Sequence, residues 1–418
     1  LQQDILQSLL ASDQVASVAF EMLDSSFASR IAQVEQSGFD SLTGLRDALQ
    51  YISFYHPVDF IKAMFDAYQR EEAPAARDAI AQILINSRMC AQGHRPICQD
   101  TGIVTAFLEV GMDLRWDGDM AVEDMVNEGI RRAYMNPDNT LRASILADPD
   151  GARKNTGDNT PAVIHKDIVS GDRVEVTVAA KGGGSENKSR FAILNPGDDI
   201  VEWVLGQVPG MGAGWCPPGI LGIGIGGTAE KAMLLAKEAL LEPVDIQELQ
   251  ARGASNRAEE LRLELFDRIN RLGIGAQGLG GLTTVLDVKV KDYPTHAANK
   301  AVAVIPNCAA TRHAHFTLDG SGPATLKPPR LEDWPEITRE AGGDVKRVDL
   351  DTVTREEVAV APTSRPAAVE AAHESSPGKP VEVEVENVDE LREALAAGAE
   401  RLLLDNFTIG QLEEAVAI

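Results

Sequence analysis

The chain has few cysteines, few aromatic residues and fewer basic than acidic residues. Four cysteines among 418 residues are too few for a disulfide framework. Lysine and arginine total 39 against 64 aspartate and glutamate residues, so the net charge is −25. This balance argues against a surface for nucleic acid or for an anionic membrane. It does not argue against a small anionic substrate, because one arginine in a pocket can bind such an anion.

The sequence also lacks an uninterrupted hydrophobic segment. Its longest apolar stretch, residues 218–235, contains five glycines together with Glu230 and Lys231, so we predict no membrane span. The first basic residue is Arg30, which does not fit the charged start of a signal peptide. We therefore expect a cytoplasmic protein. At about 150 residues per domain, the length fits two or three domains.

Hydrophobic periodicity predicts an α+β fold that mixes helices and strands. The expected helices cover residues 60–70, 73–84, 120–134, 198–208, 227–241 and 255–272. The expected strands cover residues 103–110, 162–168, 173–180, 283–290 and 301–305. Outside this region we predict a helical amino-terminal extension over 1–44, a linker over 331–379 and a small appendage over 380–418. The appendage follows a βαβα pattern, with elements at 381–385, 388–397, 401–404 and 408–416.

Three of the cysteines lie in polar or Gly/Pro-rich loops, where a thiolate can face a shared site. Cys98 and Cys216 are 118 residues apart, and Cys216 and Cys308 are 92 apart. These separations exclude the compact CxxC spacing of zinc ribbons and ferredoxins. Spacing alone leaves open whether the three are unrelated thiols or ligands of one site. The fourth cysteine, Cys90, lies on a helical pattern typical of packing.

The residues around Cys98, Cys216 and Cys308 favour the second alternative, that the three are ligands of one site. The chain contains NSRMC at 86–90, RPICQDTG at 95–102, NPDNTLR at 136–142, KGGGSENK at 181–188, GWCPPG at 214–219, PTH at 294–296 and PNCAATRH at 306–313. In this order, the stretches resemble the class I, iron–sulfur-dependent fumarate hydratases and their relatives, the L-tartrate dehydratase alpha subunits. The resemblance runs from about residue 45 to 358. It implies that residues 45–330 form an iron–sulfur hydro-lyase domain of the class I fumarase type.

The resemblance further implies that Cys98, Cys216 and Cys308 hold a [4Fe–4S] cluster in which one iron lacks a protein ligand. Such an iron is a Lewis acid toward substrate oxygen atoms. The implied reaction is the reversible hydration of fumarate to L-malate, and the alternative is dehydration of L-tartrate. A small dicarboxylate is therefore the expected substrate.

The same resemblance assigns roles around the cluster. Asp100 and His296 match catalytic positions, Asp100 as a residue that contacts the substrate or orients the base. The residues that match substrate-binding positions are Gln99, Arg142, Gly182 and Gly183. Arginine suits a carboxylate because its planar fork can bind both oxygens. Lys188, Arg312 and His313 are weaker candidates.

Two glycine-rich stretches imitate nucleotide-binding motifs. Residues 222–227 satisfy GxGxxG and precede a helix, but Pro217 and Pro218 leave little room for a strand before them. Residues 182–189 approach a phosphate loop, yet Asn187 stands where that motif requires glycine. We therefore predict no dinucleotide and no nucleotide at either stretch.

The carboxyl-terminal part departs from the fumarase pattern. Single-chain class I fumarases continue into a domain with a catalytic threonine in a TGRDAAHK-like stretch, which this sequence does not contain. Residues 367–418 instead resemble part of quinolinate phosphoribosyltransferase, with Glu384 and Asp405 at its strand-end acidic positions. Two βα units cannot close an eight-unit barrel, so we expect an appendage.

Three functional hypotheses follow from this departure. The first is a hydratase, expected as a homodimer, whose missing half comes from a separate beta-type subunit. The second is a cluster-carrying scaffold without turnover. The third and most remote is a phosphoribosyltransferase.

Overall fold

The computed structural model describes residues 41–116, 120–320, 326–335, 337, 382–385, 388–399, 401–404 and 414–415. The chain divides into two compact units, residues 1–346 and 347–418. The expected amino-terminal extension, up to residue 40, and most of the expected linker lie outside the described residues. Among the described helices, none has both the length and the apolar character needed to cross a membrane.

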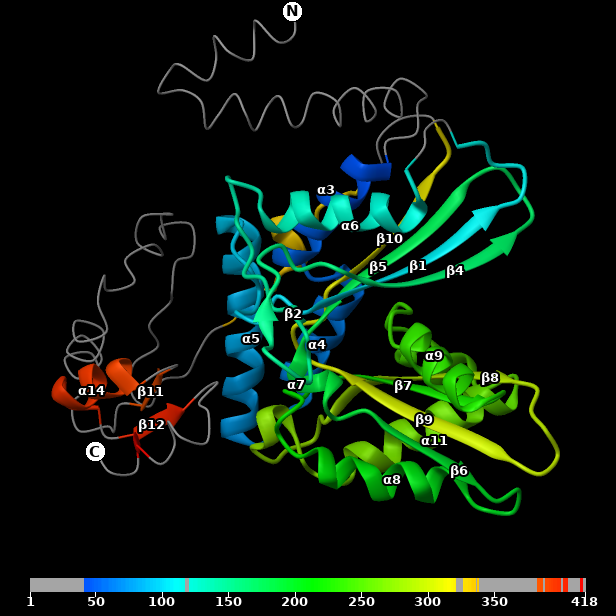
Figure 1. Cartoon of the computed structure of the whole chain (residues 1–418). Helices are drawn as coiled ribbons and strands as arrows, with labels where there is room; N and C mark the ends of the chain where they lie inside the picture. The colour runs from blue at the N-terminus through cyan, green and yellow to red at the C-terminus, as the bar shows by residue number, and fades with distance from the viewer. Residues whose placement is uncertain are drawn as a thin grey trace, which may run out of the picture. The chain divides into compact units, whose positions relative to one another are not determined.

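The first sheet of the larger unit has the strand order β10-β5-β1-β4. Its strands are β1 (Ile103–Gly111), β4 (Val163–Val169), β5 (Val174–Lys181) and β10 (His313–Leu318). Helices α3 (Ser41–Phe54) and α6 (Val122–Tyr134) lie against its outer face (Figure 1). Leu49 and Ile130 of these helices pack on Val178 of β5, and all three side chains are buried. One apolar face of the sheet is thereby covered.

The second sheet has the order β6-β9-β7-β8. Its strands are β6 (Arg190–Leu194), β7 (Gly219–Gly226), β8 (Val285–Tyr293) and β9 (Lys300–Asn307). Three helices cover its outer face: α8 (Ile200–Met211), α10 (Ile246–Arg252) and α11 (Arg257–Asn270). Their buried residues surround Trp215 and Leu221, which are both fully buried.

A group of helices packs between and alongside the two sheets (Figure 1). It consists of α4 (Val58–Arg70), α5 (Pro74–Gly93) and α9 (Ala229–Ala239). Its core cluster joins Met64 of α4 and Ala236 of α9 to Ala179 of the first sheet and Ala303 of the second. The shorter elements are β2 (Leu146–Ala147), β3 (Lys154–Asn155), α7 (Gly183–Glu186), η1 (Ala276–Gly278) and η2 (Leu331–Asp333).

The α+β prediction is confirmed, and the expected helices and strands between residues 60 and 305 occur with shifts of at most three residues at their ends, except that the helix expected at 73–84 continues to Gly93. The sequence did not indicate β6, β10 or α10. It also missed β7: residues 222–227, expected to have little room for a strand before them, largely form a strand themselves. Gly222 and Gly224 of the GxGxxG motif therefore lie within a strand, and Gly227 follows its end.

The glycines of β7 are required by the closeness of α9. A Cβ atom at Gly222 would overlap the carbonyl oxygen of Ala236, and one at Gly224 would overlap the carbonyl oxygen of Ala232. The backbone of α9 therefore rests directly on the strand, as glycine alone allows. This contact explains the motif without a dinucleotide.

We expect Gly224→Ala to destabilise the fold by about 3 kcal/mol or more, because either the strand or α9 must move. A matched control is Gly206→Ala in α8, where an added Cβ would meet no atom within 4 Å. That change should stabilise the helix by about 0.5–1 kcal/mol. Urea denaturation measures both free energies of unfolding. Equal stability of Gly224→Ala and the wild type would contradict the packing explanation.

The second unit contains two parallel strands joined by a helix. The strands are β11 (Glu382–Val385) and β12 (Arg401–Leu404), and the helix is α14 (Val388–Ala396). Val385, Leu391 and Ala394 are buried together. The first three elements of the predicted βαβα appendage are therefore present. The fourth, expected at 408–416, lies outside the described residues apart from 414–415, as does Asp405.

Candidate functional site

The three cysteine loops meet where the two sheets adjoin. Strand β9 of the second sheet passes into β10 of the first through residues 308–312. The end of β9 pairs with the start of β7, Asn307 opposite Ile220, and this places the loop of Cys216 beside that of Cys308. In the first sheet, Ile103 at the start of β1 pairs with Lys181 at the end of β5. The loop that precedes β1, which carries Cys98, therefore lies beside the turn that follows β5.

Backbone contacts tie these loops together. The Ala309 amide donates to the Cys216 carbonyl at 3.0 Å. Asp100 links two other segments, because its Oδ1 accepts from the Gly102 amide at 3.0 Å and its Oδ2 from the Gly183 amide at 2.7 Å. The loop of Cys98 is thereby fixed to the turn at α7.

The thiols occupy one electrostatic environment. Cys308 is buried, Cys98 is half-buried and Cys216 is exposed. Burial raises the pKa of the Cys98 and Cys216 thiols, and the charge of the nearby Cys308 raises both further. The Arg312 guanidinium opposes this shift and lowers the pKa of Cys98. Each cysteine therefore lies within electrostatic reach of the others, although they come from three distant parts of the sequence.

The geometry does not form a mononuclear metal site. Among the described residues, no three His, Cys, Asp or Glu side chains converge on the position of a single ion. Cysteine ligands of a cubane cluster each bind a different iron, so their sulfurs need not converge on one point. Cys216 has a φ of 55°, a sparsely populated conformation for a residue with a side chain. The three thiols therefore do not form a single-ion site, and their placement in three separate loops is compatible with ligands that each bind a different iron.

Arg142 is anchored to the loop of Cys98 through its backbone. The Thr101 hydroxyl donates to the Arg142 carbonyl, and the Tyr134 hydroxyl donates to the Thr101 carbonyl at 2.9 Å. Asn159 adds a second link: its side-chain amide donates to the Gly102 carbonyl at 3.0 Å. The Arg142 side chain itself is exposed. The backbone of this exposed arginine is thus held beside the loop of Cys98.

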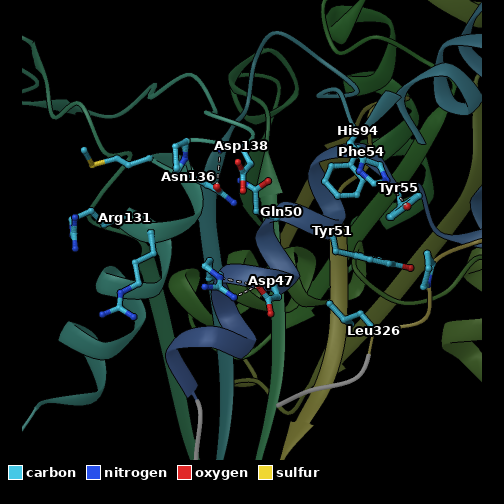
Figure 2. A pocket seen from close by; sticks show the side chains of 15 residues that line it. Asp47, Gln50, Tyr51, Phe54, Tyr55, His94, Arg131, Asn136, Asp138 and Leu326 are labelled. Carbon is cyan, nitrogen blue, oxygen red and sulfur yellow. Dashed lines mark hydrogen bonds and ion pairs between the residues drawn. The ribbon is translucent and has the colours of Figure 1, made fainter. Parts of the chain in front are cut away.

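A groove of about 930 Å³ lies behind the Arg142 loop (Figure 2). At its floor, Gln50 of α3 donates to the carbonyl oxygens of Ala133 and Asn139 at 2.5 and 3.0 Å and accepts from the Asn139 side chain at 2.8 Å. Tyr51, Phe54, Tyr55 and His94 line one side of the groove, and Arg131, Asn136 and Asp138 line another. Among the described residues that line it there is no cysteine. The residues that line the groove hold the segment before Arg142 in place, and the groove is separate from the cysteine site.

Comparison with known proteins identifies the family of the larger unit. Residues 43–317 match the sequence model of the family described as fumarate hydratase (Fumerase). The chain belongs to the fumarate hydratase family. It is 34% identical over 271 residues to the putative L(+)-tartrate dehydratase subunit alpha of Methanocaldococcus jannaschii, with 63% of this chain and 92% of the relative covered. It is 29% identical to the L(+)-tartrate dehydratase subunit alpha of Escherichia coli K12, with 63% and 86% covered.

These matches confirm a hydro-lyase domain of the class I fumarase and tartrate dehydratase alpha type. The tail has a separate match. Residues 336–418 match the family described as quinolinate phosphoribosyl transferase, C-terminal domain. Both resemblances seen in the sequence are therefore confirmed.

Within the fumarate hydratase domain, His296 lies away from the cysteines. It occupies the loop between β8 and β9, where its Nδ1 accepts from the Ala298 amide at 3.1 Å. Cys308 follows the opposite end of β9, which has eight residues. At about 3.3 Å per residue the strand alone spans roughly 25 Å. A single chain therefore does not bring His296 to the cysteine site.

The glycines that follow β5 have a structural role at the site, and not all of their amides are available to a ligand. The amide of Gly183 donates to Asp100, so it is not available to a ligand in this arrangement. A Cβ at Gly182 would lie 3.0 Å from Asp100 Oδ2. Lys188 packs on the Cys216 loop, since its Cε would be 3.0 Å from a Cβ at Gly214.

The structure adds Lys181 to the site and brings Arg312 close to it. Buried Lys181 donates to Ser185 Oγ at 2.8 Å and pairs with Glu186 at 3.1 Å. Burial lowers the pKa of Lys181 to about 8, against the raising effects of Glu186 and Cys308. One sequence signal pointed to Lys181, its place at the start of KGGGSENK. His313 is buried, and burial lowers its pKa to about 3.

Proposed function

We propose that this chain is the cluster-binding part of a hydro-lyase that catalyses the reversible hydration of fumarate to L-malate. The observation that supports this most strongly is the meeting of three cysteine loops with Asp100 and the Arg142 loop where the two sheets adjoin. In our proposal Cys98, Cys216 and Cys308 hold a [4Fe–4S] cluster. When bound, that cluster supplies Lewis acidity toward the hydroxyl and carboxylate oxygens of the substrate.

The protein side chains bind and orient the substrate. Arg142, exposed at the edge of the site, binds one substrate carboxylate through its fork of N–H donors. Gln99 lies next to the cluster position, where its Oε1 accepts from the Cys98 thiol at 3.2 Å. Asp100 has both oxygens engaged by backbone amides, so we assign it the positioning of the Cys98 loop. Gly182 allows the close approach of this loop.

The group that removes the proton from carbon is assigned to a second polypeptide. Both relatives are named as alpha subunits, and this sequence lacks the TGRDAAHK-like stretch of single-chain class I fumarases. A separate beta-type subunit would close the open side of the site and bring the missing acid–base residue. Water would be excluded at the same time.

A role for His296 requires a second copy of the chain, since one copy keeps it at the far end of β9. We therefore predict a homodimer in which His296 reaches the partner's cysteine site. Cys98→Ala and His296→Ala should each be inactive, and co-refolded mixtures should regain about a quarter of wild-type activity through mixed dimers with one intact site. The matched control mixes Cys98→Ala with Cys216→Ala, which leaves no intact site. Recovery in neither mixture would contradict the arrangement across the dimer, and full activity of His296→Ala alone would remove His296 from the mechanism.

L-tartrate dehydration is the second candidate function. Its support is that the relatives from both organisms are named as L(+)-tartrate dehydratase alpha subunits. The two reactions share loss of water from a 2-hydroxy dicarboxylate, so the same cluster and arginine would serve either.

The deciding experiment reconstitutes the full chain with iron and sulfide without oxygen, adds a beta-type subunit, and assays fumarate and L-tartrate side by side. We expect broad visible absorption of thiolate-to-iron charge transfer, and turnover only when both subunits are present. Turnover of L-tartrate alone would replace fumarate by the second candidate. Cluster binding without any turnover would favour a scaffold. Quinolinate phosphoribosyl transfer in a parallel assay would instead assign the activity to the tail.

A further inference from the structure

Arg312 is a buried cation whose donors lack protein acceptors. It lies in the segment that joins β9 to β10, four residues after Cys308, and only 4% of it is exposed. Among the described residues, neither its Nε nor its Nη2 has a hydrogen-bond partner. Buried guanidinium groups are normally paired, because an unpaired charge in the interior is costly. We therefore expect the Arg312 guanidinium to bind an acceptor that the described part of the polypeptide does not supply.

The surroundings of Arg312 point to the cysteine site. Its Nη2 and Asp100 Oδ2 both lie within 4 Å of the point where a Gly182 side chain would begin. Each Asp100 oxygen already accepts a backbone amide, and neither Arg312 Nε nor Nη2 has a hydrogen bond to Asp100. The guanidinium thus lies beside the Gly182 turn, which Asp100 fixes to the loop of Cys98.

We propose that Arg312 donates hydrogen bonds to the anionic sulfur atoms of the cysteine site, and so holds the negative charge of the cluster bound there. The inference rests on the proposed function, in which Cys98, Cys216 and Cys308 are the cluster ligands. Arg312 is on this view a positioning and charge-balancing residue that does not touch the substrate.

A substrate carboxylate is a less suitable acceptor for this arginine. Arg312 lies on the interior side, where its charge also acts on Tyr134 and His56, which are both almost fully buried. Arg142 by contrast is exposed at the solvent side of the same loops. A dicarboxylate that arrives from solvent would contact Arg142, whereas Arg312 is buried in the interior.

In the metal-free protein, the direction of the change in melting temperature tests the proposal. Arg312→Met removes an unpaired cation, so the metal-free variant should melt at the wild-type temperature or above it. The matched control is Arg262→Met, which also removes a buried arginine. Arg262 donates to the Val288 carbonyl at 2.8 Å and pairs with Asp245 and Asp287, so its loss should lower the melting temperature strongly.

The reconstituted full chain offers the second test. Cluster retention against a chelator and the reduction potential, followed by electron paramagnetic resonance, are measured for wild type, Arg312→Met, Arg312→Lys and Arg262→Met. We expect Arg312→Met to lose iron about 10–100-fold faster and to show a lower reduction potential, because a positive charge and two donors are gone. Arg312→Lys should recover part of both. Arg262→Met should keep the wild-type potential.

The outcomes separate the inference from the function on which it rests. If the wild-type chain binds no iron and sulfide, the proposed function itself is wrong, and this inference with it. If the wild type binds the cluster and Arg312→Met matches it in retention and potential, the inference alone is overturned. A raised KM for the dicarboxylate with an unchanged potential would also overturn it, since Arg312 would then bind substrate.

Discussion

Cys216→Ala is expected to abolish cluster binding and, with it, hydro-lyase turnover. The proposed open iron stabilises negative charge on substrate oxygen by several kcal/mol, which corresponds to a loss of about 10³-fold or more. Cys98→Ala and Cys308→Ala should behave alike, because each thiol is assigned to a different iron. Iron and sulfide content after anaerobic reconstitution, together with kcat/KM measured beside a beta-type subunit, tests all three.

The control for these variants is the fourth cysteine. Cys90 is buried in α5, where its thiol lies 3.6 Å from Asn86 Oδ1 and 3.5 Å from the Pro96 carbonyl. Burial raises the pKa of Cys90 to about 11, as for an unreactive packed thiol. Cys90→Ala should therefore retain full iron content. If Cys98→Ala, Cys216→Ala and Cys308→Ala each kept the iron content of Cys90→Ala, the cluster assignment would be wrong.

The helices and most strands were predictable because their burial is periodic. In β5 the alternating Val174, Val176 and Val178 face one core, and the pattern shows in the sequence. Strand β7 was not predictable in this way. Its glycines carry no side-chain pattern, and the reason for them is the backbone of α9, which packs there only in the folded chain.

The meeting of the cysteines could not be predicted from spacing. It depends on the passage of β9 from the second sheet into β10 of the first, and β10 had no clear sequence signal. The same crossover explains why Arg312 lies near the cysteine site and His296 does not. Arg312 follows the end of β9 and stays with Cys308, whereas His296 precedes its start and is carried away by the length of the strand. Family resemblance pointed to the three cysteine loops, and the strand connections determine which neighbours accompany them.

Replacing Arg142 should give the second large effect, without any loss of cluster. We expect Arg142→Met to lower kcat/KM by on the order of 10²–10³-fold, because a substrate carboxylate at the site edge would lose its charge-assisted hydrogen bonds. Arg142→Lys keeps the charge but not the planar fork, so it should recover only part of this loss. Because Thr101 holds the loop through the Arg142 backbone carbonyl, both variants should keep the loop in place.

The measurement is kcat/KM for fumarate and for L-tartrate, with iron content determined on the same samples. Arg257→Met serves as the control, since Arg257 is an exposed arginine at the start of α11 that pairs only at the surface, with Glu260 at 2.9 Å. It should leave both quantities unchanged. A fall in iron content in Arg142→Met would show that the loop supports the cysteines rather than the substrate. An unchanged kcat/KM with full iron content would remove Arg142 from the site, and the carboxylate partner would then have to come from the second polypeptide.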